Sequence, residues 1–341
     1  MRNNRRRFEA YELAYHVLSG VEKPDLSTTL LGHKLKVPFI LAPSAGNRLF
    51  HKDGERAVAK SAAKVGTIYS LSTLSTCSIE EISALTDGPK WFQLYVWKDR
   101  QLVREILQRA RTAGYSALIL TVDLPVHGNR ERELRNGFTI PPKIRPQHIW
   151  EALCSPRWTW DYLTSPCISY ANFPAGQKAE SLFNLIAEQL HAGFDWKDAE
   201  WLLGEWNGPT VIKGVVRADD AAKAVATGFN AIAISNHGGR QLDASPAPVD
   251  MLRPIRDRIG GDAELIVDGG IRRSSDIIKA MAMGANAVSF ARPYLYGLAA
   301  GGQRGVERAL DLFVSGLERD MVLLGAPSIA ALDESFIEMR R

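Results

Sequence analysis

Eight short apolar runs, rich in β-branched and aromatic residues, alternate along this chain with segments of helical periodicity. The runs are residues 37–41, 67–72, 91–96, 117–122, 210–213, 231–235, 264–267 and 287–290. Helix-like segments follow most of them, at residues 54–65, 79–85, 100–113, 218–227 and 274–283. Repeated βα units predict an α/β fold with a parallel sheet. Because no G-x-G-x-x-G turn follows any run, the repeats favour a single (β/α)8 TIM barrel over two doubly wound domains.

One connection is much longer than a βα unit needs. The fourth run ends at residue 122 and the fifth begins at residue 210. We therefore expect one domain over residues 1–341, with a long insertion after strand 4 at about residues 126–206. Its aromatic side chains predict either a lid or oligomer contact, or a surface that binds at a membrane interface. These aromatic residues are Trp150, Trp158, Trp160, Tyr162, Phe173 and Phe183.

Composition excludes several function classes. The 42 Lys and Arg exceed the 38 Asp and Glu by only four, so charge does not indicate a nucleic-acid partner. Cys77, Cys154 and Cys167 lack the paired spacing of a zinc site or a disulfide framework, which favours a reducing, cytoplasmic compartment and no metal. The basic N-terminus precedes no apolar run, and no run is long enough to span a bilayer.

Polar residues gather at the ends of the predicted strands, where a TIM barrel carries its chemistry. A single Ser or Thr at such a place is more often a helix cap than a ligand contact. The charges are harder to explain by folding alone, because a scaffold does not need several ionisable groups at one barrel mouth. The residues are Ser44, Ser72, Gln93, Tyr95, Thr121, Asp123, Lys213, Asn236, His237, Asp268 and Arg292.

The last two strands end in the sequences DGGIRR (residues 268–273) and FARP (residues 290–293). TIM barrels commonly bind phosphate at this place. Backbone N–H groups and guanidinium groups suit a phosphate dianion. The alternative is a glycine turn followed by surface arginines. The pair of motifs predicts a phosphorylated cofactor or substrate.

The sequence SNHGGRQLD (residues 235–243) follows the sixth run. Within it, Arg240 can hold a carboxylate while His237 removes a proton from the same substrate. Asp123, at the end of the fourth run, is the candidate to orient that imidazole. Arg130 is either a second cation for the carboxylate or a surface arginine. The motif predicts acid–base chemistry on an anionic substrate.

With these motifs the chain resembles the FMN-dependent α-hydroxy-acid oxidases and dehydrogenases. The resemblance is carried by WFQLYV (residues 91–96), TVD (121–123), SNHGGRQLD and DGGIRR. It implies that His237 is the catalytic base, with Asp123 as its partner and Tyr95 as a hydrogen-bond donor to a small 2-hydroxy acid. It further implies that Arg240 and Arg130 clamp the substrate carboxylate.

The same resemblance implies an FMN across the barrel mouth. Lys213 lies beside the pyrimidine end of the ring in this arrangement. The other implied contacts are Pro43, Ser44, Ala45, Ser72, Gln93 and Thr121 around ring and ribityl, and Asp268, Gly269, Gly270, Arg272, Ala291 and Arg292 around ribityl and phosphate.

Three departures from the family pattern affect the expected pocket. The chain begins later than the family pattern, and the missing segment normally supplies a tyrosine to the substrate carboxylate. This predicts that another residue closes the pocket or that the pocket is more open. Leu74 predicts an apolar side-chain pocket of intermediate size. Ala291 replaces a glycine, which is tolerable if its φ is negative.

The insertion resembles that of the respiratory L-lactate dehydrogenases. This implies a peripheral contact with the inner face of the cell membrane and a quinone acceptor, although no motif separates quinone from O2. The resemblance also implies a homotetramer. Two other functions remain open: a Schiff-base lyase or aldolase that uses Lys213, and a catalytically silent flavin-binding relative.

Overall fold

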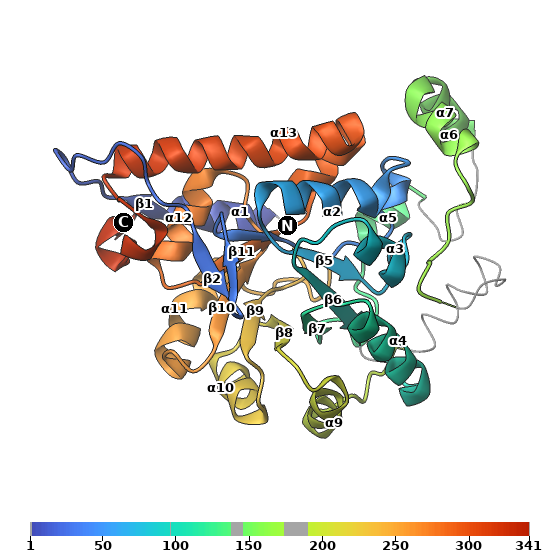
Figure 1. Ribbon diagram of the computed structural model, residues 1–341, viewed down its shortest axis with the longest axis horizontal. Helices are drawn as coiled ribbons and strands as arrows, with labels where there is room; N and C mark the ends of the chain where they lie inside the picture. Colours follow the sequence, from blue (N-terminus) through green and yellow to red (C-terminus); the bar gives the residue numbers. More distant parts are fainter. Residues whose placement is uncertain (1, 96, 138–145, 174–189, 341) are drawn as a thin grey trace.

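A closed barrel of eight parallel strands forms the centre of the computed structural model, which describes residues 2–95, 97–137, 146–173 and 190–340. The order around the barrel is β10-β11-β4-β5-β6-β7-β8-β9 (Figure 1). The predicted (β/α)8 TIM barrel is confirmed, and each predicted run overlaps one strand; residue 96 lies outside the described residues. The strands are β4 (Phe39–Leu41), β5 (Tyr69–Ser72), β6 (Lys90–Tyr95), β7 (Ala117–Thr121), β8 (Thr210–Val215), β9 (Ala231–Ile234), β10 (Glu264–Asp268) and β11 (Ala287–Phe290).

Helices surround this barrel, and the first helical turn of α4 shows why they form. The Asp99 side chain accepts hydrogen bonds from the N–H groups of Gln101 and Leu102, which caps the helix. The buried residues of α4 recur at helical spacing, so one face of this helix packs on the strands. The helices are α2 (Gly54–Val65), α3 (Ile79–Ala84), α4 (Arg100–Thr112), α9 (Trp196–Trp206), α10 (Ala218–Thr227), α11 (Pro248–Ile259), α12 (Ser274–Ala282) and α13 (Arg292–Leu324).

Strand bounds differ from the prediction at two places that have a physical reason. The first barrel strand begins at Phe39 rather than at residue 37, and Pro38 has no N–H to donate to a ladder. β8 continues to Val215, with a shift in register between Lys213 and Val215. This irregularity lies beside Asp123, because a Cβ added to Gly214 would lie 2.7 Å from the Asp123 Cβ.

The amino-terminal ends of the barrel strands are covered by a hairpin. The hairpin consists of β2 (Thr28–Leu30) and β3 (His33–Leu35), which pair antiparallel. Leu30 and Leu35 are fully buried in the cluster that fills the barrel interior, and the Leu31 N–H donates to Glu264 Oε2 at 2.7 Å. Since this end is closed by apolar side chains, the opposite rim is the end at which polar side chains can meet a ligand.

The two chain ends lie together beside the barrel. After α1 (Arg2–Arg6) and the short helix η1 (Arg7–Ala10), β1 (Tyr11–Leu13) pairs antiparallel with β12 (Ile337–Met339). The remaining short helices are η2 (Asn47–Leu49), η3 (Ile329–Ala331) and η4 (Glu334–Phe336).

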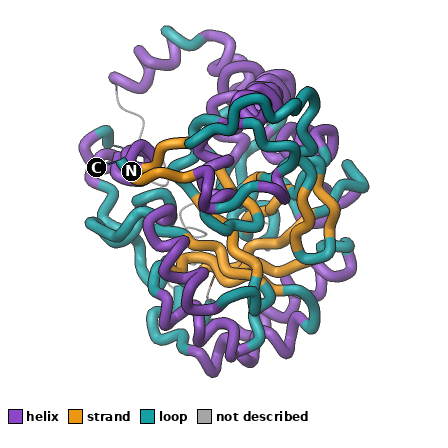
Figure 2. Tube along the Cα trace, turned by 90° about the vertical axis from the view of Figure 1, so that its left-hand side faces the viewer, coloured by secondary structure: helices purple, strands orange, loops and turns teal. Residues whose placement is uncertain are grey.

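The long connection after β7 leaves the barrel. It contains α5 (Glu131–Arg135), α6 (Pro146–Leu153) and α7 (Pro156–Thr164), and both views show α6 and α7 projecting away from the barrel (Figures 1 and 2). Phe173 differs from the other aromatic residues of this connection, because it is buried and stacks on Trp97 with ring centroids 5.0 Å apart. Phe183 lies outside the described residues.

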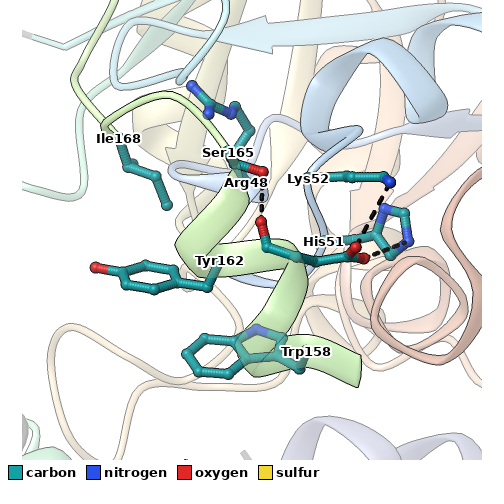
Figure 3. A pocket seen from close by; sticks show the side chains of 8 residues that line it. Arg48, His51, Lys52, Trp158, Tyr162, Ser165 and Ile168 are labelled. Atoms are coloured by element: carbon teal, nitrogen blue, oxygen red, sulfur yellow. Dashed lines mark hydrogen bonds and ion pairs between the residues drawn. The ribbon is translucent and has the colours of Figure 1, made fainter. Parts of the chain in front are cut away.

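Polar contacts fix α7 to the loop after β4. Asp161 lies 3.7 Å from His51 Nε2 and 3.5 Å from Lys52 Nζ, and Figure 3 shows both side chains directed at the same point of α7. Trp158 Nε1 donates to the carbonyl of Leu49 at 3.1 Å. The projecting segment is thus attached beside the barrel mouth.

Candidate functional site

An imidazole–carboxylate pair stands at the carboxyl-terminal rim of the barrel. His237 follows β9 and Asp123 follows β7, and the distance from His237 Nδ1 to Asp123 Oδ1 is 2.9 Å. His237 adopts a left-handed backbone conformation with φ +55°, and its N–H donates to Ser235 Oγ at 3.0 Å. Because Nδ1 faces the carboxylate, Nε2 is the ring nitrogen that can exchange a proton with another molecule.

Tyr95 is the last residue of β6 and lies next to this pair. Burial raises the pKa of Tyr95 to about 12, with a further upward contribution from Asp123, although Lys213 acts in the opposite direction. The phenol is therefore protonated at neutral pH and can donate a hydrogen bond.

Two arginines of the predicted clamp face one carboxylate. Arg240 Nη2 donates to Glu133 Oε1 at 2.7 Å, and Arg130 Nη1 lies 3.6 Å from Glu133 Oε2. Arg130 is half-buried rather than a surface arginine, and its Nη2 lies 3.5 Å from Gln241 Oε1. Sequence reasoning did not identify Glu133, although its position one helical turn after Arg130 was a usable signal.

Lys213 is held by a buried network at the centre of the mouth. Its Nζ lies 2.9 Å from Asp268 Oδ2 and 3.0 Å from Ser235 Oγ, while Ser235 Oγ donates to Asp268 Oδ2 at 2.7 Å and Ser289 donates to Asp268 Oδ1. Burial acts to lower the pKa of Lys213, but the charges of Asp268 and Asp123 outweigh it and the pKa is raised. The site therefore keeps a positive charge in its floor.

Several buried polar atoms at the mouth have no hydrogen-bond partner among the described residues. They are Gln93 Nε2, Thr121 Oγ1 and Asp123 Oδ2. Ser72 Oγ donates to Gln93 Oε1 at 3.0 Å, which identifies Nε2 as the free donor of that amide. Since buried polar groups are normally satisfied, these atoms indicate the place of a ligand.

The loops after β4 and β5 border the same space. Pro43 and Ser44 are half-buried and Ala45 is exposed. Leu74 is half-buried, its N–H donates to Ser72 Oγ at 3.2 Å, and its carbonyl accepts from the Gly46 N–H at 3.1 Å. The structure thus brings the predicted residues of these two loops to one side of the mouth.

Arginines with no ion-pair partner in the described part of the chain lie at the ends of β10 and β11. Arg272 donates to the carbonyl of Ile271 at 2.6 Å and Arg292 to that of Gly238 at 3.0 Å. Burial lowers the pKa of Arg292, as do the charges of Arg272 and Arg240. Ala291 has φ −113°, which an alanine tolerates. This excess positive charge suits a phosphate dianion.

The amino-terminal helix α1 completes this part of the rim. Asn4 and Asn236 exchange two side-chain hydrogen bonds, of 2.7 Å and 2.9 Å. Gly270 has φ +88°, and a Cβ there would lie 2.5 Å from the Asn4 carbonyl oxygen; the neighbouring Gly269 has φ +94°. The loop that carries His237 is therefore fixed to a residue more than two hundred positions earlier, a contact that no local motif could indicate.

The sequence matches the FMN-dependent dehydrogenase family over residues 1–339. The chain belongs to this family. It is 43% identical to an L-lactate oxidase of Nostoc sp. (strain PCC 7120), with 99% of this chain and 90% of that protein covered. It is 37% identical to an L-lactate dehydrogenase of Vibrio cholerae, over 96% of this chain and 88% of that one. A crystal structure of the monotopic membrane protein (S)-mandelate dehydrogenase superposes with a TM-score of 0.96 at 34% identity, covering 99% of this chain and 91% of that one.

FMN is the cofactor of this family, and the residues at the mouth fit it. The free Gln93 amide donor and Thr121 hydroxyl suit the polar edge of a flavin ring. The guanidinium groups of Arg272 and Arg292, which form no ion pair with the described residues, suit its phosphate. The family match confirms the predicted flavoprotein and its cofactor.

Proposed function

We propose that this protein oxidises an L-2-hydroxy acid to the corresponding 2-oxo acid. The observation that carries the proposal is the arrangement at one rim of a base, a protonated phenol and two arginines: His237, Tyr95, Arg240 and Arg130. The L-lactate oxidase, L-lactate dehydrogenase and (S)-mandelate dehydrogenase relatives support this substrate class.

Each group has one task in this proposal. The arginines Arg240 and Arg130 bind the substrate carboxylate, and Tyr95 donates to the substrate hydroxyl. His237 Nε2 accepts the proton that the substrate loses, and Asp123 stabilises the imidazolium that results. FMN, when bound, would take up the two electrons together with the second hydrogen that is lost when the alcohol becomes a ketone.

Lys213, the buried cation of the mouth, contributes to cofactor binding in this proposal. Lys213 and the residues of the β4 and β5 loops hold the flavin ring in this proposal, with Asp268 and the arginines of the last two strands at ribityl and phosphate. A Schiff-base lyase would need Lys213 as a neutral amine. Its ion pair with Asp268 and its raised pKa oppose that alternative.

The substrate side chain has an apolar neighbour in Leu74. A leucine at this place favours an acid with a small or medium apolar side chain over glycolate, because burying more apolar surface increases affinity. We therefore expect L-lactate or a somewhat larger L-2-hydroxy acid to be preferred.

The test is the absorbance spectrum of the purified flavoprotein under anaerobic conditions, before and after addition of L-lactate, L-mandelate or glycolate. One L-acid should bleach the oxidised flavin band. The matching D-acid is the control, and it should leave the spectrum unchanged because its hydroxyl cannot reach the base while its carboxylate is clamped. A flavin that no 2-hydroxy acid bleaches would refute the proposal. The remaining alternative would then be a catalytically silent flavin-binding protein.

We also propose that α6 and α7 contact a membrane surface. Their exposed apolar side chains include Trp150 and Trp160, each 69% exposed, and Leu163, 73% exposed. Trp residues favour the headgroup depth of a bilayer. The (S)-mandelate dehydrogenase of similar structure is described as a monotopic membrane protein. Among the helices described here, none has both the length and the apolar character needed to cross a bilayer.

A membrane contact would bring the flavin close to a quinone acceptor. The test is sedimentation of the protein with phosphatidylethanolamine–phosphatidylglycerol vesicles, for the native chain and for Trp150→Ser/Trp160→Ser/Leu163→Ser. Binding should be lost in the triple variant. A control with Trp201→Ser, on α9 of the barrel, should bind as the native chain does. Equal binding of the triple variant would refute the contact.

A further inference from the structure

A carboxylate of the chain itself lies between the two clamp arginines. Glu133 receives Arg240 Nη2 at 2.7 Å and stands 3.6 Å from Arg130 Nη1. The Glu133 and Arg130 side chains are each 31% exposed, so water competes only partly for these contacts. We propose that Glu133 occupies the position of the substrate carboxylate, and that a 2-hydroxy acid displaces Glu133 when it binds. This inference rests on the proposed function.

The electrostatics of the clamp require such a partner. Burial lowers the pKa of Arg130, as does the neighbouring charge of Arg240, whereas Glu133 acts in the opposite direction. The neighbouring acids are engaged elsewhere, Asp123 with His237 and Glu131 with Arg135. Glu133 therefore compensates two guanidinium groups that would otherwise repel each other.

The loops that carry the two arginines are fixed to each other. Gln241 Nε2 donates to the carbonyls of Asp123 and Val126, both at 3.2 Å, which ties the loop after β7 to the loop after β9. A Cβ at Gly128 would lie 2.5 Å from the Arg240 carbonyl oxygen, so only glycine permits this close approach. In this proposal Glu133 leaves the clamp by rotation about its side-chain bonds, and the barrel does not move.

Displacement raises the affinity that a ligand needs to occupy the clamp. An anion that offers only a carboxylate replaces the contacts of Glu133 with equivalent ones and gains little. A 2-hydroxy acid brings in addition a hydroxyl group for Tyr95 and His237. Glu133 therefore weakens the binding of every anion, and only ligands with the second contact overcome this competition.

The test is calorimetric titration of the purified flavoprotein with oxalate, a carboxylate that this chemistry does not oxidise. Glu133→Gln retains the shape and removes the charge, so oxalate should bind about tenfold more tightly, which corresponds to roughly 1.4 kcal/mol. Glu131→Gln is the matched control: it removes the same charge two residues away, where the partner is Arg135 at 2.9 Å, and the affinity should stay within about twofold.

Unchanged or weaker oxalate binding in Glu133→Gln would overturn the inference, because Glu133 would then merely support the arginines. Failure of oxalate to bind to both the native protein and Glu133→Gln would overturn it as well. A native protein whose flavin no 2-hydroxy acid bleaches would reject the proposed function, and the oxalate comparison would still decide the role of Glu133.

Discussion

Replacing Asp123 by asparagine removes the negative charge that faces His237 and nearly preserves the shape of the side chain. The Oδ1–Nδ1 distance is 2.9 Å, and the two side chains are only 12% and 20% exposed. Unit charges about 4 Å apart interact by roughly 4 kcal/mol at the effective dielectric constant of a protein surface. With one half to three quarters of this kept after solvent screening, Asp123→Asn should raise the barrier by about 2–3 kcal/mol, a loss of roughly 30- to 150-fold in rate.

The assay is the rate of flavin reduction by a saturating L-2-hydroxy acid, followed by anaerobic stopped-flow absorbance. Oxalate binding should change little, since Asp123 makes no contact with the clamp arginines Arg240 and Arg130 in the described part of the chain. Glu307→Gln, which breaks a surface ion pair with Lys64, is the control and should reduce at the native rate. A reduction rate for Asp123→Asn within threefold of the native rate would refute the electrostatic role of the carboxylate.

Three further predictions follow from other parts of the molecule. Lys213→Met leaves the Asp268 carboxylate buried without its counter-ion. Chemical denaturation should therefore show that the unfolding free energy falls by about 3–5 kcal/mol. A fall of less than about 1 kcal/mol would contradict a stabilising role of this ion pair. Asn4→Ala removes two buried hydrogen bonds from the loop that carries His237. It should lower the unfolding free energy by about 1–3 kcal/mol and speed the release of flavin. An unchanged rate of flavin release would show that α1 does not support the site. The hydrogen bond from Arg109 holds the pKa of Glu80 at about 2, below its usual value, so its stabilising effect is present above pH 4.5 and is lost as the pH falls towards 2. The difference in urea midpoint between the native chain and Glu80→Gln should shrink over this range, and a constant difference would contradict it.

The barrel could be predicted because its signal is local and repeated. Each strand is a short apolar run and each helix a periodic segment, so the eight units are visible without knowledge of their contacts. The imidazole–carboxylate pair was predictable for a related reason. In a TIM barrel all strand ends meet at one rim, so Asp123 after the fourth run and His237 after the sixth had to be close if the fold was right.

Other parts of the site depend on contacts between distant segments and could not be predicted. The pairing of Asn4 with Asn236 requires the path of the chain before the first barrel strand, which no periodic pattern encodes. The spacing of Glu133 from Arg130 indicates that these two can meet, but the contact of Glu133 with Arg240 joins two separate loops and has no local signal. Phe173 could not be separated from the exposed Trp160 by sequence, since burial of an aromatic ring depends on whether a partner such as Trp97 lies opposite it.

The central claim is that His237 takes a proton from a 2-hydroxy acid held at the barrel mouth. The most direct test compares anaerobic flavin reduction in the native protein and in His237→Gln with the L-acid that the native protein prefers, together with oxalate affinity in both. The account predicts that reduction slows by about 10²-fold or more in His237→Gln while the oxalate dissociation constant stays within about threefold. Reduction of His237→Gln at the native rate would contradict the claim.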